Sequence, residues 1–188
     1  LQSLNNATAT ITVTPDNDQP TLDPVGPFSF DEDEDVEADR TLTVTAEDID
    51  VETDFLTFTC NGGDQITCEV VPVNDAPDNA SANIVFSTDL DFNTEENGPE
   101  SFTIIVSDGN LQAEEIIEVT VNPVNDAPVV TDDNELTVVE DGTLVINLID
   151  RTTDIDNDVE TELTYTIDTD VSNGILTNNN DGTVTYNP

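Results

Sequence analysis

The sequence predicts an all-β protein built from tandem Greek-key β-sandwiches, and three observations support this fold class. Apolar and polar residues alternate in short runs, as in Thr41–Ala46, where Leu42, Val44 and Ala46 would share one face of a strand. Turn-forming sequences such as Asn-Gly-Gly and Asn-Asp-Gly separate these runs, and no run has a helical period. Short strands at this spacing, in repeats of roughly 100 residues, are typical of Greek-key sandwiches.

The alternation identifies individual strands along the chain. In Thr8–Thr14 the threonines would face outward, and the alternate apolar residues would face inward. Two shorter runs, Ile66–Val71 and Ala82–Phe86, are also strand-like. The residues expected to face inward are Ala9, Ile11, Val13, Ile117, Val119, Val121, Leu144, Ile146 and Leu148.

The charge balance is extreme. The chain has 43 acidic residues and only two basic ones, Arg40 and Arg151, which gives a formal net charge of −41. Such a chain repels itself unless salt screens it or bound cations neutralise it. Nucleic acid and anionic membrane surfaces are not expected as partners, because both require basic patches. A disordered acidic tail is the alternative, but the period-two apolar pattern argues against it.

Cys60 and Cys68 flank a segment that contains Gly62-Gly63. A Gly-Gly turn between two strands predicts a hairpin with a cross-strand disulfide, and therefore an oxidising compartment. A pair of free thiols is the alternative. Two cysteines without histidine make a poor zinc site.

The sequence carries few processing signals. It has no initiator Met, signal peptide or long apolar run, so we expect an excerpt or processed product of a longer chain. The triplets that begin at Asn6 and Asn79 would permit N-glycosylation.

Three pairs of segments match at one separation, which indicates a tandem repeat of domain size. Each pair is 108 residues apart: 7–20 with 115–128, 32–33 with 140–141, and 48–53 with 156–161.

The repeat predicts the domain organisation. Residues 1–19 would be the closing strand of a preceding, incomplete domain, 20–128 a complete domain, and 129–188 the front half of another. The sequence PVNDAP occurs at 123–128 and again at 72–77, where we interpret it as a loop inside the middle domain. The alternative is three half-size modules of about 50 residues, which would break the common separation.

The acidic residues are clustered, and the pattern favours Ca²⁺. Close carboxylates repel each other unless a positive charge lies between them, and this chain has almost no Arg or Lys. Ca²⁺ accepts six to eight oxygen ligands in flexible geometry, whereas Mg²⁺ retains more of its water. The segment from Asp154 is not an EF-hand, because its sixth and twelfth positions are Val159 and Tyr165.

The order of these motifs resembles the cadherin-like tandem repeats of large bacterial surface proteins and adhesins. Over one repeat the chain has Glu32 or Glu34, then Ala46-Glu47-Asp48-Ile49-Asp50, then Ser107-Asp108-Gly109, then Val124-Asn125-Asp126-Ala127-Pro128. The resemblance implies an Ig-like sandwich with Ca²⁺ at the junction between successive domains.

The resemblance also implies two ligand sets, which follow from the positions of these motifs in the repeat. The first would be Asn17, Asp18, Asp48, Asp50 and Asp108, and the second Glu32 or Glu34, Asn125, Asp126, Asp154, Asp156 and Asp158. The family's L-D-R-E stretch is missing, with Asp89 and Asp91 near its place, and Pro123 replaces the linker's leading Asp. The alternative is the solvated acidic surface of a salt-adapted protein, with no ordered ion.

The predicted function is mechanical. We expect an extracellular structural or adhesive repeat module of a cell-surface protein, stiffened by Ca²⁺, with neighbouring repeats or copies of the chain as partners. A subunit of an extracellular filament or surface layer, joined by strand addition between neighbours, is the alternative. Catalysis is not expected, because the chain has no His, no Lys and no nucleophile motif. No aromatic patch marks a ligand site.

Overall fold

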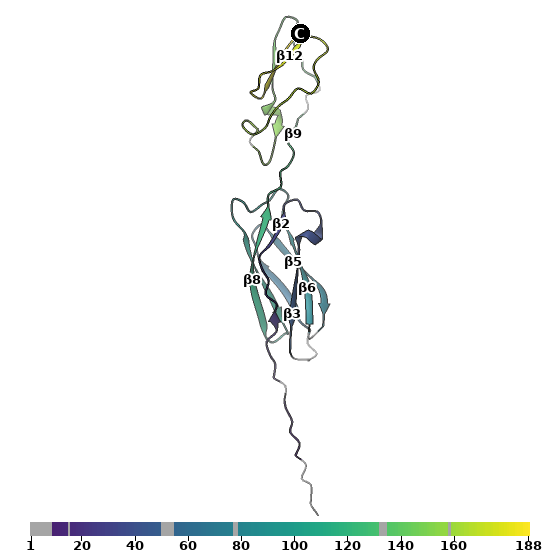
Figure 1. The fold of residues 1–188 in the computed structure, drawn as a ribbon, viewed down its shortest axis with the longest axis vertical. Coiled ribbons are helices and arrows are strands. Elements are labelled where there is room, and N and C mark those ends of the chain that lie inside the picture. The colour runs from purple at the N-terminus through teal and green to yellow at the C-terminus, as the bar shows by residue number, and fades with distance from the viewer. Residues whose placement is uncertain (1–8, 15, 50–54, 77–78, 132–134, 158) are drawn as a thin grey trace, which may run out of the picture. The chain divides into compact units, whose positions relative to one another are not determined.

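The fold is described by a computed structural model that covers residues 9–14, 16–49, 55–76, 79–131, 135–157 and 159–188. Its regular structure is strand apart from two short 3₁₀ helices, η1 (Glu37–Arg40) and η2 (Ile149–Arg151), which confirms the predicted all-β fold class. None of the described residues belongs to a helix that could cross a membrane. The chain divides into two compact units, Leu1–Pro123 (unit 1) and Val124–Pro188 (unit 2) (Figure 1). The domain boundaries expected at 19/20 and 128/129 stay predictions.

Unit 1 is a sandwich of two four-stranded sheets, with strand orders β1-β3-β6-β5 and β2-β8-β7-β4. Neighbouring strands are antiparallel except β2 and β8, which run parallel. The eight strands are β1 (Thr21–Leu22), β2 (Phe28–Asp31), β3 (Thr41–Glu47), β4 (Thr57–Gly62), β5 (Thr67–Asp75), β6 (Asn79–Ser87), β7 (Glu100–Ser107) and β8 (Gln112–Asn122).

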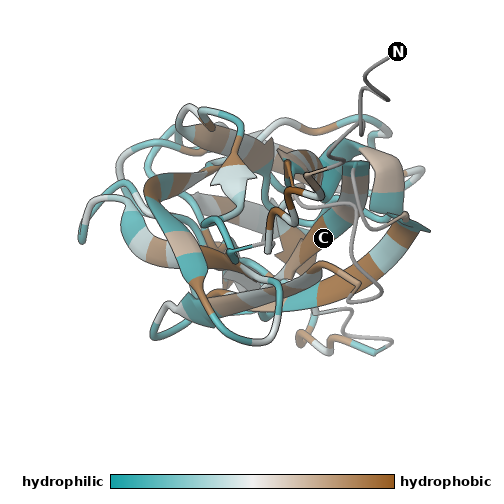
Figure 2. Ribbon diagram, turned by 90° about the horizontal axis from the view of Figure 1, so that it is seen from below, coloured by the Kyte–Doolittle hydropathy of each residue, from teal (hydrophilic) through white to brown (hydrophobic). Residues whose placement is uncertain are grey.

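The core of unit 1 lies between the two sheets. Hydrophobic and hydrophilic bands alternate along the strands in Figure 2, as the period of a half-buried strand requires. Phe86 of one sheet meets Phe102 of the other edge to face, with ring centroids 5.2 Å apart. The inward residues predicted in β3 and β8 are confirmed, except that Leu42 is only half-buried.

The cysteines form the predicted disulfide, but the predicted hairpin is wrong. Cys60 and Cys68 are bonded with their Cα atoms 6.3 Å apart, yet β4 and β5 belong to different sheets. The turn uses glycine conformations (φ of Gly62 132°, φ of Gly63 73°) that take the chain from one sheet to the other. Ile66 then enters the core. The disulfide therefore ties together the edges of the two sheets.

The PVNDAP copy at 72–77 is also not the loop that we expected. Residues Pro72–Asp75 continue β5 and pair with β6, with a register shift between Pro72 and Asn74. Because β5 is an edge strand, it can hold a proline at an irregularity without losing a central ladder bond. Pro77 lies outside the described residues.

The strand predicted over Thr8–Thr14 is wrong for its described part, residues 9–14. These residues form no strand, and the side chains of Ile11 and Val13 are 88% and 84% exposed instead of facing inward. An alternating pattern needs a neighbouring strand before it becomes a strand, and none pairs with 9–14 among the described residues.

The strands of unit 2 form two small sheets. Its strands are β9 (Val129–Val130), β10 (Leu144–Asn147), β11 (Thr152–Thr153), β12 (Ile175–Asn178) and β13 (Thr183–Asn187), in the orders β10-β13-β12 and β11-β9. Leu148 was expected to continue the strand pattern, but β10 ends at Asn147, and Leu148 is the N-cap residue of η2, which begins at Ile149. Among the described hydrophobic residues of unit 2, only Val184 is buried.

The 108-residue repeat is visible in the backbone. Strand β9 lies 108 residues after β1, and each pairs antiparallel with the strand that leads into the Asp-x-Asp segment. Asp33 and Asp141, also 108 apart, both adopt left-handed φ values of 58° and 60°. The two units therefore share local turns as well as sequence.

Candidate cation-binding clusters

In unit 1 the structure brings the linker residue Asn17 to Asp108. Asn17 Nδ2 donates to Asp108 Oδ2 at 3.0 Å, although the two residues are 91 positions apart. Gln19 fixes the linker beside the start of β8, because its Nε2 donates to the carbonyl oxygen of Gln112 at 2.6 Å. We call Asn17, Asp108 and Asn110 cluster 1.

The β7–β8 turn determines where the Asp108 carboxylate points. Its Oδ1 accepts the backbone N–H groups of Asn110 and Leu111, at 2.6 Å and 2.7 Å. Burial raises the pKa of Asp108, but these donors and the Asn17 amide outweigh it and hold the pKa below its ordinary value. A carboxylate has about four acceptor positions. Asp108 therefore keeps about one acceptor position for an ion.

In unit 2 the second linker copy meets the segment Asp154–Asn157. The backbone N–H of Asp126 donates to Asp156 Oδ2 at 2.5 Å. Asn157 Nδ2 donates to Asn125 Oδ1 at 3.3 Å. We call Asn125, Asp126, Asp154, Asp156 and Asn157 cluster 2.

Asp154 is the most unusual carboxylate of cluster 2. Its Oδ1 accepts the N–H groups of Asp156 and Asn157 and the Asn157 side-chain amide, at 2.8–3.1 Å. Its Oδ2 is buried and has no hydrogen-bond partner among the described residues. The Asn157 side chain, together with the two backbone N–H groups, lowers the pKa of Asp154 despite its desolvation, so the group is ionised near neutral pH.

The chemistry of cluster 2 fits a hard cation. A buried, charged oxygen without a partner is unfavourable unless something positive reaches it. The available groups are carboxylate, amide and carbonyl oxygens, which Ca²⁺ prefers. Position 154 corresponds to the fully buried Ala46 of the first repeat, so unit 1 lacks this carboxylate.

Glu32 and Glu34 follow β2 in unit 1 and have different surroundings. Glu32 is buried, and its Oε2 accepts from Asn93 Nδ2 at 3.0 Å. Glu34 Oε1 accepts the backbone N–H of Val36 at 2.7 Å, which closes a local turn. Asp33 Oδ1 accepts the backbone N–H of Asp91 at 3.1 Å. These residues form an acidic rim at the end of β2.

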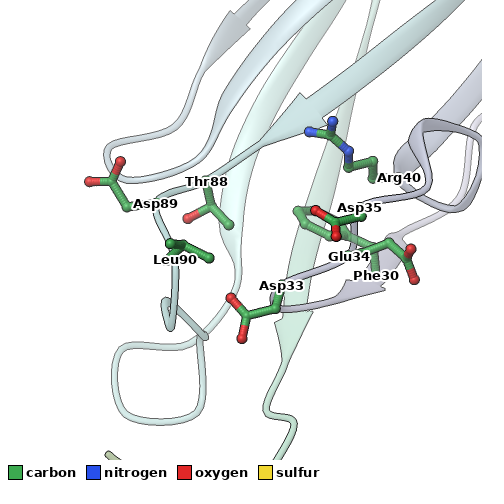
Figure 3. Close-up of a pocket in the computed structure, with 8 residues that line it drawn as sticks. All are labelled: Phe30, Asp33, Glu34, Asp35, Arg40, Thr88, Asp89 and Leu90. Carbon is green, nitrogen blue, oxygen red and sulfur yellow. The ribbon is translucent and has the colours of Figure 1, made fainter. Parts of the chain in front are cut away.

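A cavity of about 170 Å³ lies beside this rim, lined by Phe30, Asp33, Glu34, Asp35, Arg40, Thr88, Asp89 and Leu90. In Figure 3 the carboxylates are spread around the cavity, and those of Asp89 and Glu34 point away from each other. Arg40 Nη1 donates to the Phe86 carbonyl and to Ser87 Oγ. The carboxylates that line this cavity therefore do not converge on one point inside it (Figure 3).

The remaining predicted ligands belong to neither cluster 1 nor cluster 2. Asp18 lies in the exposed linker, and Asp48 is half-buried directly after β3. Asp50 and Asp158 lie outside the described residues. Sequence reasoning missed Asn93, Asn110 and Asn157, whose amides orient the predicted acidic and linker residues. Asn110 and Asn157 each lie within three positions of a predicted aspartate, which was the available signal.

Residues 124–188 match the cadherin-like domain family. The cadherin-like match coincides with unit 2 and confirms the resemblance for these residues. Together with the β-sandwich of unit 1, it supports a cadherin-like, Ig-like fold. An origin in a bacterial surface protein stays a prediction. The chain has no significant match among curated proteins.

Several solved structures are weakly similar to the chain. An endo-fucoidan hydrolase of glycoside hydrolase family 107 is 16% identical over 89% of this chain and 24% of its own, with a TM-score of 0.38. The chain thus spans about a quarter of that enzyme's length. Titin domains Z1Z2 in complex with telethonin are 12% identical over 89% of this chain and 79% of theirs, with a TM-score of 0.33. Neither likeness carries information about activity.

Proposed function

We propose that this chain is a non-catalytic structural or adhesive repeat module whose acidic clusters bind Ca²⁺ at the junctions between domains. The cadherin-like match of residues 124–188 supports the modular role. The observation that carries the Ca²⁺ proposal is the buried Oδ2 of Asp154, which has no partner among the described residues.

Ca²⁺ would stiffen the chain by relieving the repulsion between acidic side chains near a linker. At a net charge of −41, like-charged side chains near a linker repel each other across roughly 10 Å at 0.1 M salt. A cation that binds carboxylates on both sides of a linker replaces this repulsion with shared ligands. In cluster 2, Asp154 and Asp156 would hold the ion.

Location and partners belong to the same proposal. The disulfide between Cys60 and Cys68 is a feature of oxidising compartments, which supports an extracellular, cell-surface position. The partners would be neighbouring repeats or copies of the same chain, with a cell-surface ligand still to be identified.

Melting and small-angle scattering in Ca²⁺ and in EDTA test the proposal. We expect Ca²⁺ to raise the melting temperature and to increase the maximum particle dimension, and Mg²⁺ to have a smaller effect. Added salt at equal ionic strength controls for simple screening. If EDTA changes neither the melting temperature nor the dimension, the proposal is wrong.

Strand addition is a second candidate, favoured by residues 9–14. Ile11 and Val13 are exposed, whereas the equivalent Val119 and Val121 of β8 are buried. A segment with the pattern of a closing strand and no described neighbour could pair with another copy of the chain. In this case the scattering mass would grow with protein concentration in EDTA as well as in Ca²⁺.

A further inference from the structure

The two linker asparagines, Asn17 and Asn125, lie 108 residues apart and share one local hydrogen bond. In each, Nδ2 donates to the carbonyl oxygen of the following aspartate, at 2.9 Å to Asp18 and 2.7 Å to Asp126. The same local bond thus occurs in both units.

The other side of each carboxamide contacts the loop that carries a predicted aspartate. Asn17 Oδ1 accepts from Asn110 Nδ2 at 3.5 Å, and Asn125 Oδ1 accepts from Asn157 Nδ2 at 3.3 Å. Asn17 Nδ2 also donates to Asp108 Oδ2. Each asparagine therefore bridges the linker backbone and an aspartate loop with protein contacts alone.

We propose that Asn17 and Asn125 are positioning residues, which hold the linker against the aspartate loops by donating N–H groups, and that their Oδ1 atoms are not cation ligands. This inference rests on the proposed Ca²⁺ binding and corrects the ligand role that the cadherin-like resemblance implies for both residues. Each Oδ1 accepts one N–H from a neighbouring asparagine amide, whereas Asp154 Oδ2 accepts none among the described residues.

The two roles predict opposite effects of one substitution. Aspartate has nearly the same shape as asparagine and is a stronger Ca²⁺ ligand, but it cannot donate a hydrogen bond when ionised. Asn125→Asp should therefore strengthen Ca²⁺ binding if Asn125 is a ligand, and weaken it if Asn125 is a positioning residue.

Amide hydrogen exchange in EDTA tests positioning without any metal. The N–H of Asp126, which donates to Asp156, should exchange about tenfold faster in Asn125→Asp, because the linker loses its neighbouring bond. Asn125→Ser keeps a short donor and should recover part of the protection. Asn173→Asp adds the same charge in an exposed turn of unit 2 and should leave Asp126 unchanged.

Calorimetric titration with Ca²⁺ supplies the second measurement. We expect Asn125→Asp to bind at least about fivefold more weakly than the parent chain, and Asn173→Asp to bind no more weakly than the parent. Should Asn125→Asp fail to fold, Asn17→Asp repeats the test in unit 1, with Asn97→Asp at an exposed position as its charge control.

The outcomes separate the two proposals. If Asn125→Asp binds Ca²⁺ as tightly as the parent chain or more tightly, or leaves the Asp126 exchange rate unchanged, the positioning role is wrong. If the parent chain binds no Ca²⁺ but Asn125→Asp still accelerates exchange, the proposed function fails and the positioning role stands for the metal-free protein.

Discussion

Units 1 and 2 share a repeat but hold themselves together differently. Unit 1 encloses large side chains such as Phe86, Phe102 and Ile84 between two sheets, each less than 2% exposed. The strands of unit 2 form two smaller sheets, and Val184 is its only buried hydrophobic residue among those described. The comparison indicates that the packed core stabilises unit 1, whereas unit 2 depends more on interactions outside an apolar core.

The two units also differ in how far protein donors satisfy their carboxylates. Glu100 in unit 1 accepts three backbone N–H groups, from Asp64, Gln65 and Ile66, at 2.7–3.1 Å. Asp154 in unit 2 leaves one buried oxygen without a described partner. Unit 1 satisfies a key carboxylate with protein donors, while unit 2 is expected to need a cation for its own.

The largest expected effect is the loss of stability when a buried hydrophobic side chain is truncated in each unit. Phe102→Ala should destabilise unit 1 by about 4 kcal/mol, because it removes a fully buried ring that contacts Phe86. Val184→Ala in unit 2 should cost about 2 kcal/mol. Denaturant unfolding, followed unit by unit with hydrogen exchange, measures both. Equal losses would show that the packing of the two units does not differ in this way.

A smaller effect tests the Glu100 contacts. Glu100→Gln keeps the size of the side chain but removes the charge that binds three N–H donors, and should cost about 2 kcal/mol. The loss should be the same in Ca²⁺ and in EDTA, because no cation is involved. A loss seen only in Ca²⁺ would place a metal at Glu100 and remove this contrast between the units.

The pKa of Glu100 in the parent chain predicts how the difference in stability between the parent chain and Glu100→Gln changes with pH. Burial raises the pKa of Glu100, but the three N–H donors outweigh it and leave the pKa below its ordinary value of 4.5. The stability from the ionised carboxylate is therefore fully present above pH 4.5 and is lost as the pH falls through the lowered pKa. The parent chain and Glu100→Gln should converge in stability in strong acid.

Much of the fold could be predicted because alternation and turns are local properties. The pattern of β3 and β8 indicated the correct buried faces, since both strands have neighbours. The same kind of pattern failed at residues 9–14, where no described strand pairs. The Gly62-Gly63 turn was also ambiguous, because two glycines can close a hairpin or lead to the opposite sheet. Only the partner strands decide between these outcomes.

The candidate site was predicted less completely. The resemblance to cadherin-like repeats identified Asp108, Asp154 and Asp156 as candidate ligands, but it could not show which oxygen atoms the protein already satisfies. That depends on Asn110 and Asn157, whose backbone and side-chain donors are set by turn geometry. The sequence therefore identified the acidic residues but not their remaining capacity for an ion.

Calorimetric titration of Ca²⁺ into the parent chain and into Asp154→Asn tests the central claim most directly. Asp154→Asn keeps the shape of the side chain but removes the charge at Oδ2, and Glu135→Gln removes one exposed charge without a described contact. We expect Ca²⁺ to bind the parent chain, Asp154→Asn to bind at least about tenfold more weakly, and Glu135→Gln to bind like the parent. A parent chain without measurable binding, or equal affinities in the parent chain and Asp154→Asn, would contradict the account.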